Sequence, residues 1–278
     1  MLRRFIKMQG AGNDYIYFDC LHEEIPHPEL LAVRLSDRHK GIGGDGIVLI
    51  CPSDVADAKM RMFNADGSEG NMCGNAIRCV GKYLHDNKIA AGEDIRVETR
   101  SGIKNLHCYA GTDGKVRSVR VDMGPAVFEP ARIPVSLPGD RIVDAPYEIA
   151  GKTYAVTCVS MGNPHCVVFE DPDGLDLTKI GPLFENAPIF PDRINTEFVK
   201  KIDARTLKMR VWERGSGETM ACGTGACAAA AAAVAKGIFP AGEEITVRLL
   251  GGDLKIEVGK TVYMTGEAEI VFTGEVEI

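Results

Sequence analysis

The sequence predicts a mixed α/β (α+β) fold of two similar units, each with a β-sheet around one helix. Three observations support this prediction. With 278 residues, the chain is long enough for two domains of roughly 150 residues each. The segment Met60–Gly74 recurs as Met209–Gly223, so one half of the chain repeats the other. In each half, short β-branched and aromatic runs precede this segment, and a helix-like stretch follows it.

The repeat extends along the chain. The two segments read MRMFNADGSEGNMCG and MRVWERGSGETMACG, with Met, Arg, an aromatic residue, Glu, Cys and Gly at matching positions 149 residues apart. Nearly the same offset relates Asn13 to Asn163, Asp45 to Asn195, and Ile95–Gly102 to Ile245–Gly252. Because the matches keep the same order and spacing, we interpret the chain as a duplication. We place the division near residue 120, which predicts domains at 1–120 and 121–278, with a closing strand that could return to the first.

The predicted strands are short runs bounded by Gly, Asn, Asp or Pro. In the first copy they are Tyr15–Asp19, Ile47–Ile50, Lys59–Phe63, Ile95–Thr99, Ile103–Tyr109 and Val116–Met123. In the second copy they are Val156–Val159, Val167–Glu170, Thr196–Val199, Leu207–Trp212, Ile245–Leu249, Leu254–Val258, Val262–Thr265 and Ala268–Phe272.

Each copy has one helix directly after the repeated segment. The first is predicted over Gly74–Asp86, with apolar residues on one face. The second is predicted over Gly223–Lys236, before Gly237 and Pro240, which are typical of a helix end. The second helix is nearly all alanine and has no charge before Lys236. Because a helix that is apolar all round is buried, we expect a sheet to wrap around it.

Composition limits the partners and the compartment. The chain has 39 acidic and 32 basic residues, a net charge of -7, and no long basic run, so neither nucleic acid nor a membrane is expected as a partner. There is no signal-like segment and no apolar run of about 20 residues. The nine cysteines cannot all pair within one chain. We therefore expect mostly free thiols and a cytoplasmic location.

Two cysteines, Cys73 and Cys222, occupy the same position in the two copies, where a Gly-rich loop meets a helix. A thiol at a helix N-terminus faces unpaired N–H groups and the positive end of the dipole, so we expect a lowered pKa. The N–H groups that follow could bind a carboxylate. If the cysteines face each other across a cleft, one thiolate could remove a proton from a carbon beside that carboxylate while the other thiol delivers one to the opposite face. That reaction inverts a stereocentre.

Other interpretations of the cysteines remain open. The remaining seven lie in apolar runs and are interpreted as small buried side chains: Cys20, Cys51, Cys79, Cys108, Cys158, Cys166 and Cys227. The spacings are not those of a zinc site, so no metal is expected. A redox dithiol formed by Cys73 and Cys222 is the main rival hypothesis.

Several polar residues could support a site. His165 in MGNPHC could tune thiol ionisation. Glu213 and Arg214 together would suit a ligand with both ammonium and carboxylate groups, because Arg can bind a carboxylate through two N–H groups. Four asparagines lie in turn-like contexts related by the repeat and could line a cleft: Asn13, Asn64, Asn163 and Asn195.

The sequence resembles the diaminopimelate epimerases over essentially its whole length. The resemblance rests on GAGNDY (10–15), GIGGDG (41–46), FNADGSE and MCGN within 63–75, GNPH (162–165), RINTEF (193–198), and WERGSGET with ACGTGACA within 212–228. It implies two pseudo-symmetric domains, each a β-barrel-like sheet around a central helix, with the active site in the cleft between them. It also implies cofactor-independent interconversion of LL- and meso-diaminopimelate in lysine and peptidoglycan precursor biosynthesis, and a homodimer.

The resemblance also assigns roles to residues. Cys73 and Cys222 match the proton donor and the proton acceptor. Gly74, Asn75, Gly223 and Thr224 match the residues that hold the carboxylate at the reacting carbon. The substrate contacts match Asn13, Asn64, Asn163, Asn195, Glu213 and Arg214, and the pair that adjusts cysteine ionisation matches His165 and Glu213. Some members have a substrate-contacting Gln after the GIGxD motif, where this chain has Gly46.

Three other functions remain compatible with the sequence. One is a two-cysteine racemase of the proline or hydroxyproline type, which the Glu213–Arg214 contacts disfavour. The second is a thiol-redox protein, which predicts a reversible disulfide between Cys73 and Cys222. The third is an amino-acid-binding protein that uses the same cleft without proton exchange.

Overall fold

The computed structural model describes residues 2–278, which form two compact units. Unit 1 runs to Asp122 and also includes Thr265–Ile278, and unit 2 is Met123–Met264. The chain leaves unit 1 in strand β8 (Val116–Gly124) and re-enters it in strand β17 (Val262–Glu267). The closing segment of the chain thus belongs to the unit in which the chain begins.

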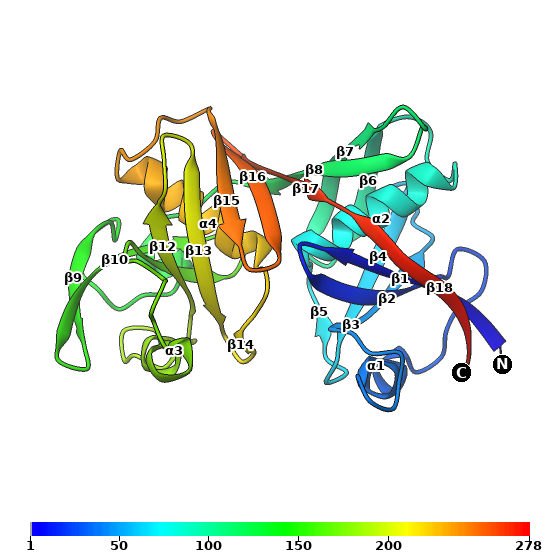
Figure 1. The fold of residues 1–278 in the computed structure, drawn as a ribbon, viewed down its shortest axis with the longest axis horizontal. Coiled ribbons are helices and arrows are strands. Elements are labelled where there is room, and N and C mark those ends of the chain that lie inside the picture. Colours follow the sequence, from blue (N-terminus) through cyan, green and yellow to red (C-terminus); the bar gives the residue numbers. More distant parts are fainter. Residues whose placement is uncertain (1) are drawn as a thin grey trace. The chain divides into compact units, whose positions relative to one another are not determined.

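Unit 1 contains a mixed sheet and two helices (Figure 1). Besides β8, its strands are β1 (Leu2–Gly10), β2 (Asn13–Asp19), β3 (Gly46–Cys51), β4 (Ala58–Asn64), β5 (Glu69–Gly70), β6 (Asp94–Thr99), β7 (Gly102–Ala110) and β18 (Glu269–Glu277). Its helices are α1 (Pro28–Ser36) and α2 (Gly74–Asp86). The pair β2–β3 is parallel, β3–β4 is antiparallel and β4–β6 is parallel.

Unit 2 repeats this order of elements. Its strands are β9 (Ala145–Ile149), β10 (Lys152–Ser160), β11 (Pro164–Val168), β12 (Asn195–Lys201), β13 (Thr206–Glu213), β14 (Gly217–Glu218), β15 (Glu244–Leu249) and β16 (Gly252–Val258). Its helices are α3 (Leu177–Glu185), α4 (Gly223–Ala235) and the short 3-10 helix η1 (Pro130–Arg132). The pair β11–β12 is parallel, β12–β13 is antiparallel and β13–β15 is parallel, as in the matching strands of unit 1.

The two units differ in the strand that pairs with the outer edge of β1 in unit 1 and of the equivalent strand β10 in unit 2. In unit 2, β10 pairs with β9, which directly precedes it in the chain. In unit 1, β1 pairs with β18, which comes from the other end of the chain. The register places Leu2 opposite Glu277 and Gln9 opposite Glu269.

Each sheet packs around one helix, as the sequence predicted. Helix α4 contacts β10, β11, β12, β13, β15 and β16, and α2 contacts β1, β2, β6 and β7. From Gly225 to Ala233, every residue of α4 is buried. Because alanine side chains are small, six strands can approach this helix closely. The predicted fold class and both central helices are confirmed.

A second helix packs on each sheet, and the sequence analysis had assigned neither. Helix α3 places Phe184 between Tyr154 and Phe198, with ring centroids 5.1 and 5.3 Å away. Helix α1 buries Leu31 and Leu35. Strand β1 was not predicted either, because its charged residues Arg3, Arg4 and Lys7 hide the strand pattern.

Several predicted strands had the wrong limits. The strands predicted at Val156–Val159 and Thr196–Val199 are longer in the structure, at Lys152–Ser160 and Asn195–Lys201. The strand predicted at Val167–Glu170 is Pro164–Val168, because proline is tolerated at the first residue of a strand. The strand predicted at Ala268–Phe272 is Glu269–Glu277, and its mostly exposed residues lack the alternation of a half-buried strand. Across residues 2–278, no helix combines the length and the hydrophobicity that a membrane span requires.

Candidate active site

Cys73 is the N-cap of α2, with extended backbone angles (φ -129°, ψ 120°). Its sulfur accepts a hydrogen bond from the Ala76 N–H at 3.5 Å and donates one to Asn13 Oδ1 at 3.3 Å. The Asn13 amide in turn donates to Asp45 Oδ2 at 2.6 Å. The start of β2 and the loop before β3 therefore fix the surroundings of this thiol.

The first turn of α2 is held by a buried arginine. Arg78 donates to the Gly74 carbonyl at 3.1 Å and to Asn75 Oδ1 at 3.0 Å. Asn75 is itself buried. The predicted carboxylate-binding residues Gly74 and Asn75 thus lie in a fixed first turn next to Cys73, whereas Asn64 bonds Ser68 at 3.0 Å in the β4–β5 turn.

Cys222 is the N-cap of α4 with nearly the same backbone angles (φ -117°, ψ 107°). Its sulfur accepts a hydrogen bond from the Gly225 N–H at 3.4 Å and lies 3.5 Å from Thr224 Oγ1. The side chain of Cys222 is buried, whereas Cys73 is partly exposed. The two thiols therefore occupy equivalent positions in their units but differ in access to solvent.

The expected lowering of the pKa is wrong for Cys222. Burial raises the pKa of this thiol well above its usual range, and the nearby Glu213 and Glu197 carboxylates raise it further. The hydrogen bonds from Thr224 and the Gly225 N–H favour the thiolate but do not outweigh desolvation. The helix N-terminus is present as predicted, but the sequence did not reveal how deeply the thiol is buried.

Asn163 and His165 lie beside this thiol in a chain of hydrogen bonds. Asn163 Nδ2 donates to Thr224 Oγ1 at 3.2 Å, and Asn163 Oδ1 lies 3.0 Å from His165 Nε2. The other ring nitrogen of His165, Nδ1, lies 2.7 Å from Glu197 Oε1. The carboxylate that contacts His165 is therefore Glu197, which is not one of the predicted site residues.

Glu213 ends β13 and is bonded by the Thr219 hydroxyl. Burial raises the pKa of its carboxyl group, while His165 acts electrostatically to lower it. His165 therefore acts on the Glu213 carboxyl group without a direct hydrogen bond to it. Arg214, next in sequence, donates its backbone N–H to Asn195 Oδ1 at 2.9 Å and its guanidinium to the Asp192 carbonyl at 2.9 Å.

A family model for diaminopimelate epimerase matches residues 5–129 and 157–271. The chain belongs to the diaminopimelate epimerase family. The curated diaminopimelate epimerases of Acetivibrio thermocellus and Methanococcus maripaludis are 55% and 53% identical to it. These matches cover 99% of this chain in both cases, and 99% and 100% of the two relatives.

Solved structures share the fold at low sequence identity. A hydroxyproline epimerase from Agrobacterium vitis has a TM-score of 0.70 at 15% identity, covering 99% of this chain and 91% of that one. A phenazine biosynthesis protein from Bacillus anthracis has a TM-score of 0.70 at 16% identity, covering 100% of both chains. These likenesses show that the diaminopimelate epimerase family shares its fold with other proteins.

The structure adds two carboxylates that the sequence analysis had missed. Glu197 is fully buried in β12, where a charged residue between Thr196 and Phe198 interrupts a buried run. Glu185 at the end of α3 accepts hydrogen bonds from the Trp212 indole at 2.7 Å, the Gly215 N–H at 2.9 Å and the Arg193 guanidinium at 3.0 Å. A charged residue inside an apolar strand pattern was the available signal for Glu197, whereas Glu185 lies in a helix that was not predicted.

Within residues 2–278 the other seven cysteines form no disulfide, and six of them are buried. Burial raises the pKa of Cys79 to about 11 and that of Cys108 to about 12. Cys51 is the exception, because it is only partly buried. The interpretation as buried side chains therefore applies to six of the seven.

Proposed function

We propose that the chain interconverts LL- and meso-diaminopimelate, with Cys73 and Cys222 as its two acid–base groups and without a cofactor. Family membership supports the reaction. The observation that carries the residue roles is the equivalent placement of the two thiols, each at the N-cap of the central helix of its unit. A two-base inversion needs one such group on each face of the reacting carbon.

In this reaction one thiolate takes the proton from the α-carbon, and the pair of electrons left behind spreads into the adjacent carboxylate. The opposite thiol then delivers its own proton to the other face, so the configuration inverts and the roles of the sulfurs exchange. The N–H groups at the start of α2 and α4, at Gly74, Asn75, Gly223 and Thr224, are the proposed donors to that carboxylate. Helix N-termini stabilise such negative charge.

The rest of the substrate would be selected by polar side chains in both units. The proposed contacts are Asn13, Asn64, Asn163, Asn195, Glu213 and Arg214. Arg214 can grip the distal carboxylate, and Glu213 can accept from an ammonium group. His165 and Glu213 would adjust the ionisation of Cys222.

This mechanism requires free thiols, so we propose that the protein works in a reducing cytoplasm. The family resemblance adds a role in lysine and peptidoglycan precursor biosynthesis. We also propose a homodimer, on the family resemblance alone. Sedimentation equilibrium would test this last point, and a monomer at micromolar concentration would contradict it.

Proton exchange in D₂O tests the reaction directly. The wild-type chain should introduce deuterium at the α-carbon of LL- and meso-diaminopimelate but not of proline. In Cys73→Ala and Cys222→Ala, epimerisation should fall by about 100-fold or more, the range expected for loss of an acid–base group. Cys108→Ala, which removes a buried thiol of unit 1 outside the site, is the matched control and should keep its activity.

The outcomes separate the rival functions. Exchange at proline instead of diaminopimelate would favour a racemase of the proline type. No exchange with any amino acid, together with a reversible Cys73–Cys222 disulfide, would favour the redox hypothesis. Full activity in both cysteine variants would overturn the two-thiol mechanism.

A further inference from the structure

The carboxylate of Glu197 is completely buried, and so is the imidazole of His165 that it contacts. One oxygen, Oε1, lies 2.7 Å from His165 Nδ1. The other, Oε2, has no hydrogen-bond partner among residues 2–278. A buried carboxylate in such surroundings is strongly unfavourable unless a cation pairs with it.

Among the titratable groups near Glu197, His165 is the one that can carry a positive charge and pair with it. Glu213 from β13 and the Cys222 thiol from the start of α4 act on the same region, and both are acids. Burial raises the pKa of the Cys166 thiol of β11, and the Glu197 charge raises it further. His165 is the base in this group and contacts Glu197 directly. A proton on Nδ1 would therefore neutralise the buried carboxylate.

The second nitrogen of His165 also faces an acceptor. Nε2 lies 3.0 Å from Asn163 Oδ1, while Asn163 Nδ2 donates to Thr224 Oγ1 at 3.2 Å. Because Oδ1 can only accept, Nε2 must carry a proton to form this bond. Because Thr224 Oγ1 accepts the hydrogen bond from Asn163, the proton of the Thr224 hydroxyl can be donated to Cys222 Sγ, which lies 3.5 Å away.

We propose that Glu197 is a positioning residue of the epimerase reaction that keeps His165 protonated on both ring nitrogens. This inference rests on the proposed function. The chain of donors then runs in one direction, from His165 through Asn163 and Thr224 to the Cys222 sulfur. Glu197 itself does not touch the substrate.

This arrangement addresses the difficulty of ionising Cys222. Burial and two carboxylates disfavour its thiolate, so that thiolate depends on donors and on a nearby cation. A neutral His165 with its proton on Nδ1 would present a lone pair at Nε2. The Asn163 amide would then turn to donate to it, and Thr224 would donate to Asn163 instead of to the sulfur.

Nitrogen-15 NMR of histidine-labelled protein tests the protonation directly, with His165→Gln to assign the signal. At pH 8, where a free imidazole is neutral, His165 of the wild type should show two protonated nitrogens. Glu197→Gln preserves the size of the side chain but not its charge, so its His165 should show only one. A purely structural role for Glu197 would not produce this change.

Kinetics provide the second readout. We expect Glu197→Gln to lower kcat by about 10-fold or more with little change in KM, since the residue acts on Cys222 and not on substrate binding.

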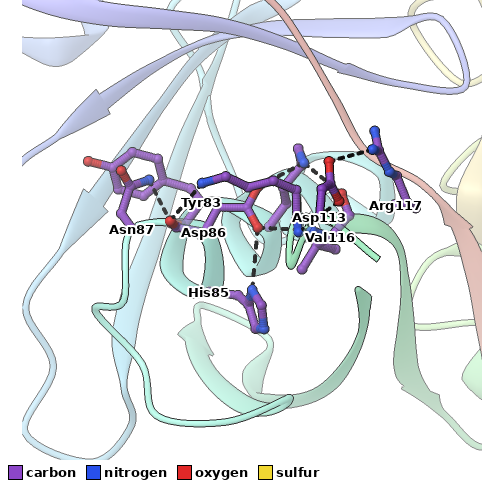
Figure 2. Close-up of polar contacts among 9 residues, drawn as sticks. Tyr83, His85, Asp86, Asn87, Asp113, Val116 and Arg117 are labelled. Atoms are coloured by element: carbon purple, nitrogen blue, oxygen red, sulfur yellow. Dashed lines mark hydrogen bonds and ion pairs between the residues drawn. The ribbon is translucent and has the colours of Figure 1, made fainter. Parts of the chain in front are cut away.

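Asp86→Asn is a matched control from unit 1. Asp86 is a nearly buried carboxylate that accepts a hydrogen bond from Lys82 Nζ at 2.8 Å. It also accepts one from the Val116 N–H at 2.9 Å and lies 3.3 Å from His85 Nδ1 (Figure 2). Asp86 is the last residue of α2, whereas Cys73 caps its first turn, so the two are separated by the length of the helix, about 20 Å. This variant should lose thermal stability but keep kcat and the His165 signal.

The outcomes separate this inference from the function on which it rests. If the wild type exchanges no α-proton, the proposed function fails, and the NMR signal of His165 still reports its protonation. If the wild type is active but its His165 has one protonated nitrogen at pH 8, the inference is overturned, even if Glu197→Gln does not fold. An active Glu197→Gln with wild-type kcat overturns it as well.

Discussion

Cys73 and Cys222 hold the same place in their units, but their sulfur atoms have different neighbours. Cys73 donates to Asn13, a neutral amide. Cys222 is buried near Glu213 and Glu197. The sequence analysis predicted both positions from the repeat, because the loop–Cys–helix pattern is local. The family resemblance pointed to Glu213, but Glu197 was not predicted, because it reaches Cys222 from β12, a strand distant in sequence.

Gly225 illustrates how tightly the residues around Cys222 are packed. A Cβ atom there would lie 2.7 Å from Glu197 Oε1 and 3.2 Å from the Cys222 sulfur. We therefore predict that Gly225→Ala lowers kcat by about 10-fold or more by displacing one or both groups. Steady-state kinetics in both reaction directions would measure the effect. The control is Gly259→Ala, whose Cβ has 3.6 Å to its nearest atom and should be tolerated. Wild-type kcat in Gly225→Ala would show that this packing is unimportant.

At the scale of elements, helix α3 holds the loop that follows β13. Glu185 accepts hydrogen bonds from Trp212 and the Gly215 N–H, on either side of Glu213 and Arg214. A fixed loop orients the Arg214 guanidinium that is proposed to bind the distal carboxylate. The contribution of α3 to the site is therefore positional.

Replacing Glu185 with Gln should loosen this loop. We expect KM for diaminopimelate to rise by about 3- to 10-fold with a smaller change in kcat, since one charged hydrogen-bond acceptor is lost. Trp212 is the single tryptophan, so its fluorescence reports the same contact and should shift. Glu170→Gln, which removes an exposed ion pair with Lys152, is the control and should change neither. Unchanged fluorescence and KM in Glu185→Gln would exclude this role for Glu185.

The elements that could be predicted from the sequence have a clear hydrophobic periodicity or clear start and stop residues. Helix α2 has the predicted limits, and α4 ends one residue early, because Cys at the N-cap and Gly237 beyond the end mark its limits. Strand β1 and helices α1 and α3 were missed. Their charges, or an internal Pro182 in α3, obscure the local pattern, and tertiary packing decides their structure.

At the scale of the whole molecule, buried thiols link stability to pH. Cys79 and Cys108 have pKa values raised by burial to about 11 and about 12, above the 9.0 of an exposed thiol. Between pH 9 and 11 the unfolded chain therefore loses these protons while the folded chain keeps them. The stabilisation is complete below pH 9 and is lost as pH rises.

We predict that the free energy of unfolding falls by about 1.4 kcal/mol per pH unit for each such thiol in this window. Urea unfolding at pH 9, 10 and 11 would measure the slope. In Cys108→Ala the unfolding free energy should fall less steeply with pH, by the contribution of one thiol proton. This difference in slope does not depend on how much the variant changes the overall stability. Equal slopes in the two proteins would show that Cys108 ionises normally in the folded chain.

The pairing of β18 with β1 determines the order in which the molecule can be completed during synthesis. Unit 2 has been synthesised in full once Met264 is added, whereas unit 1, although it begins first, lacks β18 until Glu269–Glu277 follow. Until then β1 has an unpaired edge available to other chains. The unit that begins first in the chain is therefore completed only after the unit that follows it has been synthesised.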